Sequence, residues 1–140
     1  MLSGLACLHA NGLLHRDLKP SNCLLFLDSF TLKLADFGMS RPVEQSARPI
    51  TARRCTALYR APEVMLGSEQ YSYPSDVWGA GAVFAEFISR EIIFAAQTEM
   101  EVVKKIFSIV GAPTEANWPG FSALPLASIY IKIVEHGPGT

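Results

Sequence analysis

Residues 15–22 read His-Arg-Asp-Leu-Lys-Pro-Ser-Asn, and residues 36–38 read Asp-Phe-Gly. Two short apolar runs lie between these motifs, at residues 24–26 and 31–35, and an Asp-Ser pair separates the runs. Apolar runs of this length around polar turn residues predict a β-hairpin. The hairpin would bring the Asn that ends the first motif next to the Asp that begins the second.

The two motifs resemble the catalytic loop and the metal-binding loop of protein kinases, and such a match needs support from the rest of the chain. That support is present, because Ala-Pro-Glu at residues 61–63 resembles the end of a kinase activation segment and residues 76–81 resemble the start of a buried helix. The sequence of residues 58–63 and 106–120 resembles that of the CMGC group of kinases, and within this group it resembles the cyclin-dependent kinases most closely.

The resemblance implies a mainly α-helical fold with a small β-hairpin, which is part of the α+β C-terminal lobe of a protein kinase. It covers residues 1–125, whereas residues 126–140 show no family counterpart and are expected to be a divergent tail. In kinases the Gly-rich loop, the strand Lys and the helix Glu that hold ATP all precede the catalytic loop. Only fourteen residues precede His15, so we expect this chain to lack the N-terminal lobe.

Local patterns predict further elements along the chain. Leucines at three-residue spacing before Gly12 predict the end of a helix, and residues 98–110 predict an amphipathic helix that begins with a capping box. Ser75 or Asp76 is expected to cap a helix that is apolar on nearly all sides and therefore belongs in a core. Residues 36–63 are polar and contain several Arg and Pro, which predicts a loop.

Composition argues against several kinds of partner. Twelve basic and thirteen acidic residues give a net charge of −1, so no overall field attracts nucleic acid or an anionic membrane, and neither is expected. No segment has the length of a membrane span or the pattern of a signal peptide. Three cysteines without metal-like spacing favour free thiols in a reducing compartment, cytoplasmic or nuclear.

Phosphoryl transfer needs a residue that orients the nucleophile, ligands for metal ions, and cations near the phosphates. The resemblance implies that Asp17 orients the substrate hydroxyl and that Lys19 contacts the γ-phosphate. Asn22 and Asp36 would hold two Mg²⁺ ions, for which oxygen ligands are suited. Leu24 resembles the residue that forms the floor under adenine. ATP and Mg²⁺ are therefore the expected cofactors.

The same resemblance implies a substrate class. Lys19 and Thr56 are the residues that serine/threonine kinases, rather than tyrosine kinases, have at these motif positions. Arg60 resembles the arginine that meets a strained carbonyl near Cys55 and leaves a site for proline after the target hydroxyl, since proline has no N–H to leave unpaired. Proteins with Ser-Pro or Thr-Pro sites are the expected substrates. Cys55 and Leu58 occupy positions where kinases of this group usually have valine and tryptophan, which indicates an altered substrate-binding surface.

Arg16 marks kinases whose activation loop is ordered by a phosphate, because a guanidinium beside the catalytic Asp pairs with an anion. Thr51 lies in the register of the activating phosphothreonine of cyclin-dependent kinases, with Ser46 and Thr56 as alternatives. Ala-Arg at residues 52–53 departs from the Thr-x-Tyr signature of mitogen-activated kinases, the runner-up subfamily. The resemblance also implies a cyclin-type activator for the full-length form.

Two interpretations of the chain are open at this point. In the first, it belongs to an active, proline-directed serine/threonine kinase that uses MgATP. In the second, it is a non-catalytic kinase fragment that acts as a binding module for substrates or regulators of longer relatives. A Gly-rich loop and a Val-Ala-x-Lys strand encoded upstream would favour the first.

Overall fold

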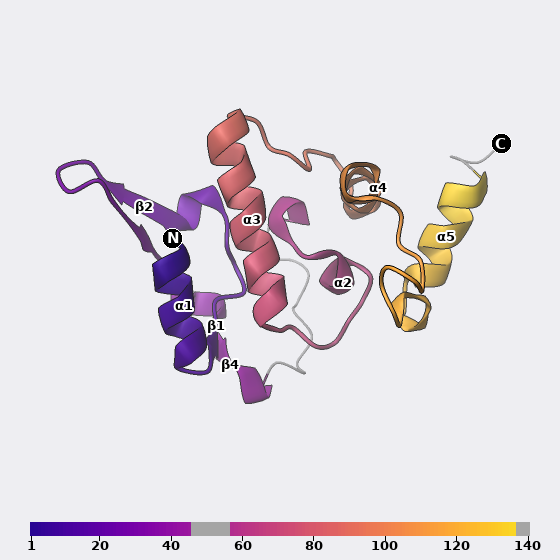
Figure 1. Cartoon of the computed structure of the whole chain (residues 1–140), viewed down its shortest axis with the longest axis horizontal. Helices are drawn as coiled ribbons and strands as arrows, with labels where there is room; N and C mark the ends of the chain where they lie inside the picture. Colours follow the sequence, from indigo (N-terminus) through magenta and orange to yellow (C-terminus); the bar gives the residue numbers. More distant parts are fainter. Residues whose placement is uncertain (46–56, 137–140) are drawn as a thin grey trace.

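The computed structural model describes residues 1–45 and 57–136. Its helices are α1 (Leu2–Ala10), α2 (Pro62–Met65), α3 (Tyr73–Ser89), α4 (Glu99–Val110) and α5 (Ala127–His136). Two antiparallel sheets of two strands each pair β1 (Leu13–Leu14) with β4 (Arg41–Pro42), and β2 (Cys23–Phe26) with β3 (Thr31–Leu34). This mainly helical fold with small sheets confirms the fold class expected from the sequence (Figure 1).

The predicted hairpin is formed by β2 and β3, which pair along all four residues of each strand. Beyond the ladder, the Ala35 amide donates to the Asn22 carbonyl at 2.9 Å. This bond holds the residue before Asp36 against Asn22. The hairpin prediction is therefore confirmed, together with its consequence that the ends of the two motifs lie next to each other.

The segment predicted as a loop, residues 36–63, contains short ordered elements in its described parts. β4 pairs with β1, and the Val43 amide donates to the Gly12 carbonyl at 2.8 Å, which extends the pairing. Single 3₁₀ turns form at Phe37–Met39, Val43–Gln45 and Ala57–Tyr59. The loop prediction is wrong in these places, because elements of two or three residues are too short to leave a hydrophobic period.

Helices α1 and α4 form where the sequence predicts them. α1 ends just before Gly12, whose φ of +70° lies in the left-handed region that glycine adopts readily. α4 begins with the predicted capping box, in which the Thr98 hydroxyl accepts from the Glu101 amide at 3.2 Å and the Glu101 carboxylate accepts from the Thr98 amide at 3.0 Å. The buried side chains of α4 are Val102, Val103, Ile106 and Phe107.

Helix α3 begins earlier than predicted. Its N-cap is Ser72, and the Ser72 amide donates to the Ser75 hydroxyl at 3.3 Å as part of a capping box. Pro74 lies in the first turn, where a missing N–H removes no intrahelical bond. The prediction that Ser75 or Asp76 caps the helix is wrong, because both lie inside the first turn and the fully buried Asp76 side chain has other partners.

Helix α3 crosses the middle of the molecule, with α1 and β1 on one side and α2, α4 and α5 on the other (Figure 1). Gly79 permits this arrangement, since a Cβ there would lie 3.1 Å from Leu18 Cβ and 3.4 Å from the Tyr59 carbonyl oxygen. A larger residue would push α3 away from both neighbours. The larger core, between α3 and the helices that follow it, includes Leu66, Val83, Val102, Ile106 and Phe121.

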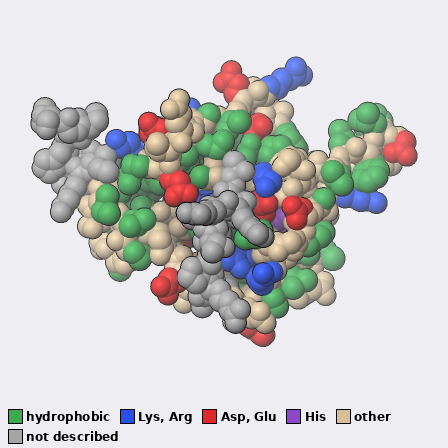
Figure 2. Space-filling view, turned by 180° about the vertical axis from the view of Figure 1, so that it is seen from behind, with side chains coloured by type: hydrophobic (Ala, Val, Ile, Leu, Met, Phe, Trp, Pro, Cys, Tyr) green, Lys and Arg blue, Asp and Glu red, His purple; other side chains and the backbone are tan. Residues whose placement is uncertain are grey.

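One face of α3 is open in this structure. Val77, Phe84 and Ile88 are 54%, 57% and 69% exposed. The tip of the projecting hairpin is also apolar, with Leu27 and Phe30 70% and 86% exposed, and Figure 2 shows apolar side chains gathered there. Helix α3 thus lies in a core on one side, where Val83 is 0% exposed, while its other face has no cover among the described residues. None of the helices within these residues is long and apolar enough to cross a membrane.

The described chain ends in α5, which packs as part of the core. Residues 129–133 alternate Ile with Tyr and Lys, yet they are helical. Ala127 and Tyr130 are 0% and 4% exposed, and the Tyr130 ring lies 4.7 Å from the Phe107 ring of α4. Three-residue spacing puts both on one face of a helix. The boundary at residue 125 between kinase domain and tail stays a prediction.

We predict that Glu101→Gln reduces the pH dependence of stability. Hydrogen bonds from the Thr98 and Gln97 amides lower the pKa of Glu101 below its ordinary value. A carboxylate with a lowered folded pKa stabilises the fold above its unfolded pKa of about 4.3, and this contribution disappears as the pH falls through the folded value. Between roughly pH 6 and pH 3, Tm should therefore fall further in the parent than in Glu101→Gln.

The matched control is Glu91→Gln, which removes the same charge from an exposed position after α3. This variant should follow the parent across the whole pH range. If Glu101→Gln also follows the parent, the capping box contributes no pH-dependent stability.

Candidate active site

The 15–22 loop is held together by its own polar side chains. The Asp17 oxygen Oδ2 accepts from the Lys19 ammonium at 2.7 Å and from the Asn22 nitrogen Nδ2 at 3.1 Å. The same Nδ2 donates to the Asp17 carbonyl at 2.8 Å. Asp17 and Asn22 are 7% and 5% exposed, so water competes little for these bonds. Three of the predicted site residues thus form one cluster.

His15 connects this loop to the end of β3. Its nitrogen Nδ1 accepts from the Asp17 amide at 3.3 Å, and Nε2 lies 3.1 Å from the Ala35 carbonyl oxygen. Since a carbonyl only accepts, this pattern requires the imidazole proton on Nε2. The ring also packs against Phe37, with 5.3 Å between centroids. One side chain therefore fixes the loop and the Asp-Phe-Gly turn to each other.

Asp36 and Asn22 provide oxygen atoms from the two ends of the hairpin. Asp36 has a φ of +60°, in the left-handed region, and its Oδ1 accepts from the Gly38 amide at 3.2 Å. Asn22 donates to Asp17 through Nδ2, so its oxygen Oδ1 points to the opposite side of the amide group. These oxygens suit Mg²⁺, which takes one or two protein ligands besides phosphate. The described part of the chain has no metal-binding group of three His, Cys, Asp or Glu.

A buried carboxylate on α3 holds the backbone of the loop. Asp76 is 0% exposed, and its Oδ1 accepts from the Arg16 amide and from the Tyr71 hydroxyl, both at 2.9 Å. Its Oδ2 accepts from the His15 amide at 2.8 Å and lies 2.9 Å from Nε2 of His9. Four polar partners compensate a charge that would be very unfavourable to bury alone.

This role of Asp76 was not predicted from the sequence. A signal existed in the position of Asp76 within an otherwise apolar helix, because an Asp that enters a core with such a helix is almost always paired. No local pattern identifies the partners of Asp76, since His9 lies 67 positions away along the chain. Tyr71 lies only five positions away, but its hydroxyl could equally have faced solvent.

Tyr59 and Arg60 fasten the chain just before α2 to two other helices. Tyr59 donates to Glu86 of α3 at 2.6 Å, and burial together with this carboxylate raises the pKa of Tyr59 well above its ordinary value. Arg60, a predicted substrate-site residue, is 9% exposed and donates to Glu99 of α4 at 3.0 Å. Because the Glu99 side chain is 55% exposed, the ion pair contributes only about 1 kcal/mol or less.

The other predicted site residues differ in how far the structure tests them. Outside the described residues lie Thr51, Cys55 and Thr56, so their roles, and the contact expected between Arg60 and a carbonyl near Cys55, stay predictions. Arg16 has a φ of +70°, and its Cζ lies 5.6 Å from the centroid of the Tyr71 ring. Leu24 lies on β2 and is 49% exposed, which leaves an open apolar surface beside the cluster.

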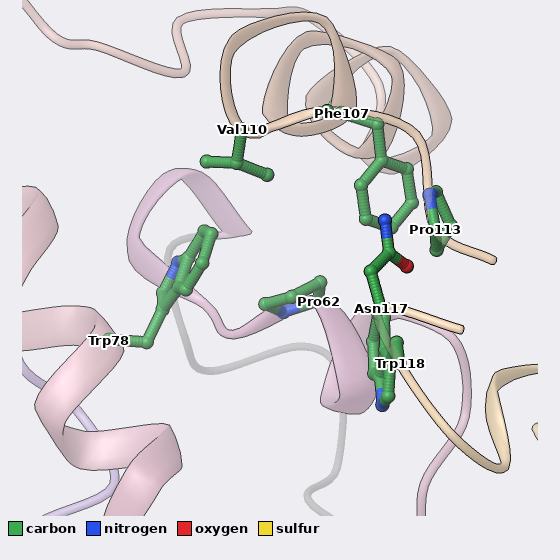
Figure 3. Close-up of a pocket in the computed structure, with 8 residues that line it drawn as sticks. Pro62, Trp78, Phe107, Val110, Pro113, Asn117 and Trp118 are labelled. Atoms are coloured by element: carbon green, nitrogen blue, oxygen red, sulfur yellow. The ribbon is translucent and has the colours of Figure 1, made fainter. Parts of the chain in front are cut away.

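A hollow of about 260 Å³ lies between α2, α3 and α4 (Figure 3). Its walls are apolar and include Pro62, Trp78, Phe107, Val110, Pro113 and Trp118. Asn117 also lines it, but its amide bonds the surrounding loop, accepting from the Thr114 amide at 2.7 Å and donating to the Ala112 carbonyl at 3.1 Å. The hollow contains none of the predicted site residues and offers apolar contact rather than chemistry.

Comparison with known families agrees with this geometry. The family model described as "Protein kinase domain" matches residues 1–133. The chain therefore belongs to the protein kinase family. Within the family it is similar to cyclin-dependent kinases, as the sequence predicts: "Cyclin-dependent kinase G1" of Arabidopsis thaliana is 44% identical over 127 residues, which are 91% of this chain and 21% of that protein.

Two solved structures share the fold. The yeast RNA Pol II CTD kinase CTDK-1 complex matches with a TM-score of 0.83 and 36% identity, over 99% of this chain and 44% of that one. The CAK complex of Chaetomium thermophilum bound to ATP-γ-S matches with a TM-score of 0.79 and 43% identity, over 88% of this chain and 38% of that one. The chain thus spans less than half of each relative.

We predict that Asp76→Asn destabilises the fold by about 2–4 kcal/mol. An amide keeps one acceptor oxygen and turns its own N–H groups toward donors, so the bonds from the His15 and Arg16 amides cannot both persist. Urea unfolding followed by tryptophan fluorescence measures the change in the free energy of unfolding. The control is Asp28→Asn, in the exposed hairpin turn, which should change it by less than about 1 kcal/mol. Equal urea midpoints of unfolding for Asp76→Asn and Asp28→Asn would contradict the role of Asp76 in holding the loop.

Proposed function

We propose that this chain carries the catalytic residues of an ATP- and Mg²⁺-dependent protein serine/threonine kinase. The observation behind the proposal is the buried Asp17 carboxylate, bonded on one oxygen by Lys19 and Asn22. Family membership supports it, as does the matched complex bound to ATP-γ-S. Because the chain spans only part of its relatives, the activity of the whole protein belongs to the proposal.

Each residue would act by position and charge. The Asp17 carboxylate accepts the hydrogen bond of the substrate hydroxyl and takes its proton as that oxygen bonds to the γ-phosphorus and the bond to ADP breaks. Lys19, with Nζ 2.7 Å from Asp17 Oδ2, places a positive charge beside the transferred phosphate. Asn22 and Asp36 would hold Mg²⁺, which when bound neutralises phosphate charge.

The proposed acceptor is a Ser or Thr followed by Pro. Lys19 and Thr56 support the hydroxyl class through their likeness to serine/threonine kinases. Arg60 supports the proline preference, because it is buried at the end of the activation segment and anchored to Glu99. Proline suits a site that offers no partner for an N–H group. Cys55 would shape this site where valine is usual.

We also propose control by phosphate and by a protein activator. A phosphate on Thr51 would form charge-assisted hydrogen bonds with Arg16, the neighbour of Asp17. A cyclin-type activator is supported by the name of the Arabidopsis relative, a cyclin-dependent kinase. The free thiols of Cys7 and Cys23 support a reducing compartment, cytoplasmic or nuclear.

A kinase assay on the full-length protein that contains these residues tests the proposal. Peptide libraries should show enrichment of proline directly after the phosphorylated Ser or Thr. Asp17→Asn should lower kcat by about 100-fold or more with little loss of folding, because a group that orients the nucleophile acts mainly in the transition state. Thr51→Ala should lower the rate and leave the proline preference intact.

Asp28→Asn is the matched control for Asp17→Asn and should keep parental activity. Phosphorylation without proline enrichment would reject the proposed substrate class. Full activity of Asp17→Asn would remove Asp17 from its role, and full activity of Thr51→Ala would put the activating site elsewhere.

Residues 1–140 by themselves support a second function, that of a non-catalytic binding module. The half-exposed Leu24 offers adenine only one apolar side, and the open face of α3 leaves Phe84 and Ile88 in solvent. Phosphates held on one side are poorly oriented, and positioning supplies most of the rate of phosphoryl transfer. We therefore propose that this 140-residue chain alone binds MgATP weakly, transfers no phosphate and is poorly soluble.

Calorimetric titration of the 140-residue chain with MgATP tests whether the chain alone is non-catalytic. We expect a dissociation constant above about 1 mM. Micromolar binding would contradict the expectation. So would phosphate incorporation into a protein substrate that is abolished by Asp17→Asn.

A further inference from the structure

A tyrosine outside the predicted site is linked to Arg16 in two ways, through the Asp76 carboxylate and through its own ring. Tyr71 lies between α2 and α3 and is 7% exposed. Its hydroxyl donates to Asp76 Oδ1 at 2.9 Å, the same oxygen that accepts from the Arg16 amide at 2.9 Å. Its ring faces the Arg16 guanidinium, with Cζ 5.6 Å from the centroid. One side chain therefore touches the carboxylate that supports the Arg16 backbone and also the charged end of Arg16.

The backbone of Arg16 needs this support. Its φ of +70° is a left-handed conformation that is unfavourable for a residue with a Cβ and persists only where the surroundings impose it. The next residue is Asp17, so the peptide that follows Arg16 sets the direction of the catalytic carboxylate. A small rotation of that peptide would move the Asp17 carboxylate relative to a substrate hydroxyl, and phosphoryl transfer is sensitive to such shifts.

The two oxygens of Asp76 serve different residues. Oδ1 bonds the Arg16 amide and Tyr71, whereas Oδ2 bonds the His15 amide and His9. Loss of the Tyr71 hydroxyl would leave both partners of Oδ2 in place. Asp76 would then stay buried and bonded, while the oxygen that supports Arg16 would lose one of its two donors and be free to shift.

We propose that Tyr71 is a positioning residue for Asp17. It keeps Asp76 Oδ1 aligned with the Arg16 amide and holds the Arg16 guanidinium against its ring. This inference rests on the proposed kinase function.

The experiment compares Tyr71→Phe with Tyr73→Phe in the full-length protein. Both variants lose one phenolic hydroxyl and keep the ring, and Tyr73 packs on His9 with 4.6 Å between ring centroids. In Tyr71→Phe we expect kcat to fall about 10-fold with unchanged KM for peptide and ATP. Amide hydrogen exchange at residues 15–17 should become about 10-fold faster, with no change over α4. Tyr73→Phe should match the parent in both measurements.

The outcomes separate this inference from the proposed function. If the parent is active, a normal kcat in Tyr71→Phe overturns the inference, and so does a loss explained by a lower Tm with normal kcat per folded molecule. If the parent transfers no phosphate, the proposed function fails, and hydrogen exchange still decides the positioning role. Unchanged exchange at residues 15–17 then overturns it, and faster exchange confined to those residues supports it.

Discussion

The buried charge of Asp76 is the constraint on which the candidate active site depends. A carboxylate without exposed surface must have hydrogen-bond donors around it. Two of these donors are the His15 and Arg16 amides, which belong to a loop without regular secondary structure. The same hydrogen bonds therefore compensate the charge of Asp76 and fix the shape of the loop. Gly79, on the next turn of α3, allows the helix to approach closely enough for these bonds.

From this anchor, a series of short polar contacts leads to the proposed metal ligands. The loop held by Asp76 presents Asp17, whose carboxylate is bonded by Lys19 and Asn22. Asn22 in turn accepts from the first residue after β3, which precedes Asp36. Each functional side chain is thus fixed by another polar group, and such support is what holds a catalytic geometry in place before substrate binds. The hairpin contributes position rather than chemistry.

The parts of this arrangement that were predictable from the sequence are those whose partners are close in the chain. The capping box of α4 and the hairpin that brings Asn22 beside the residue before Asp36 each join residues or runs a few positions apart. The contact of His9 with Asp76 spans 67 positions, and that of Arg60 with Glu99 spans 39. No local pattern encodes such pairs. The apolar residues after Asp76 and their resemblance to a kinase helix predicted that α3 exists, but not which of its faces is covered here, because coverage depends on the elements that pack there.

Helix α3 combines two kinds of interaction with different consequences. Apolar contacts such as those of Val83, which is 0% exposed, are roughly proportional to buried area and have little directional preference. The bonds of Asp76 are directional and set the rotation of the helix relative to the loop. Weaker apolar packing would therefore lower stability while leaving the geometry of the candidate site largely intact in the molecules that remain folded. Weaker polar contacts at Asp76 would instead change the direction of Asp17, even where the rest of the core is preserved.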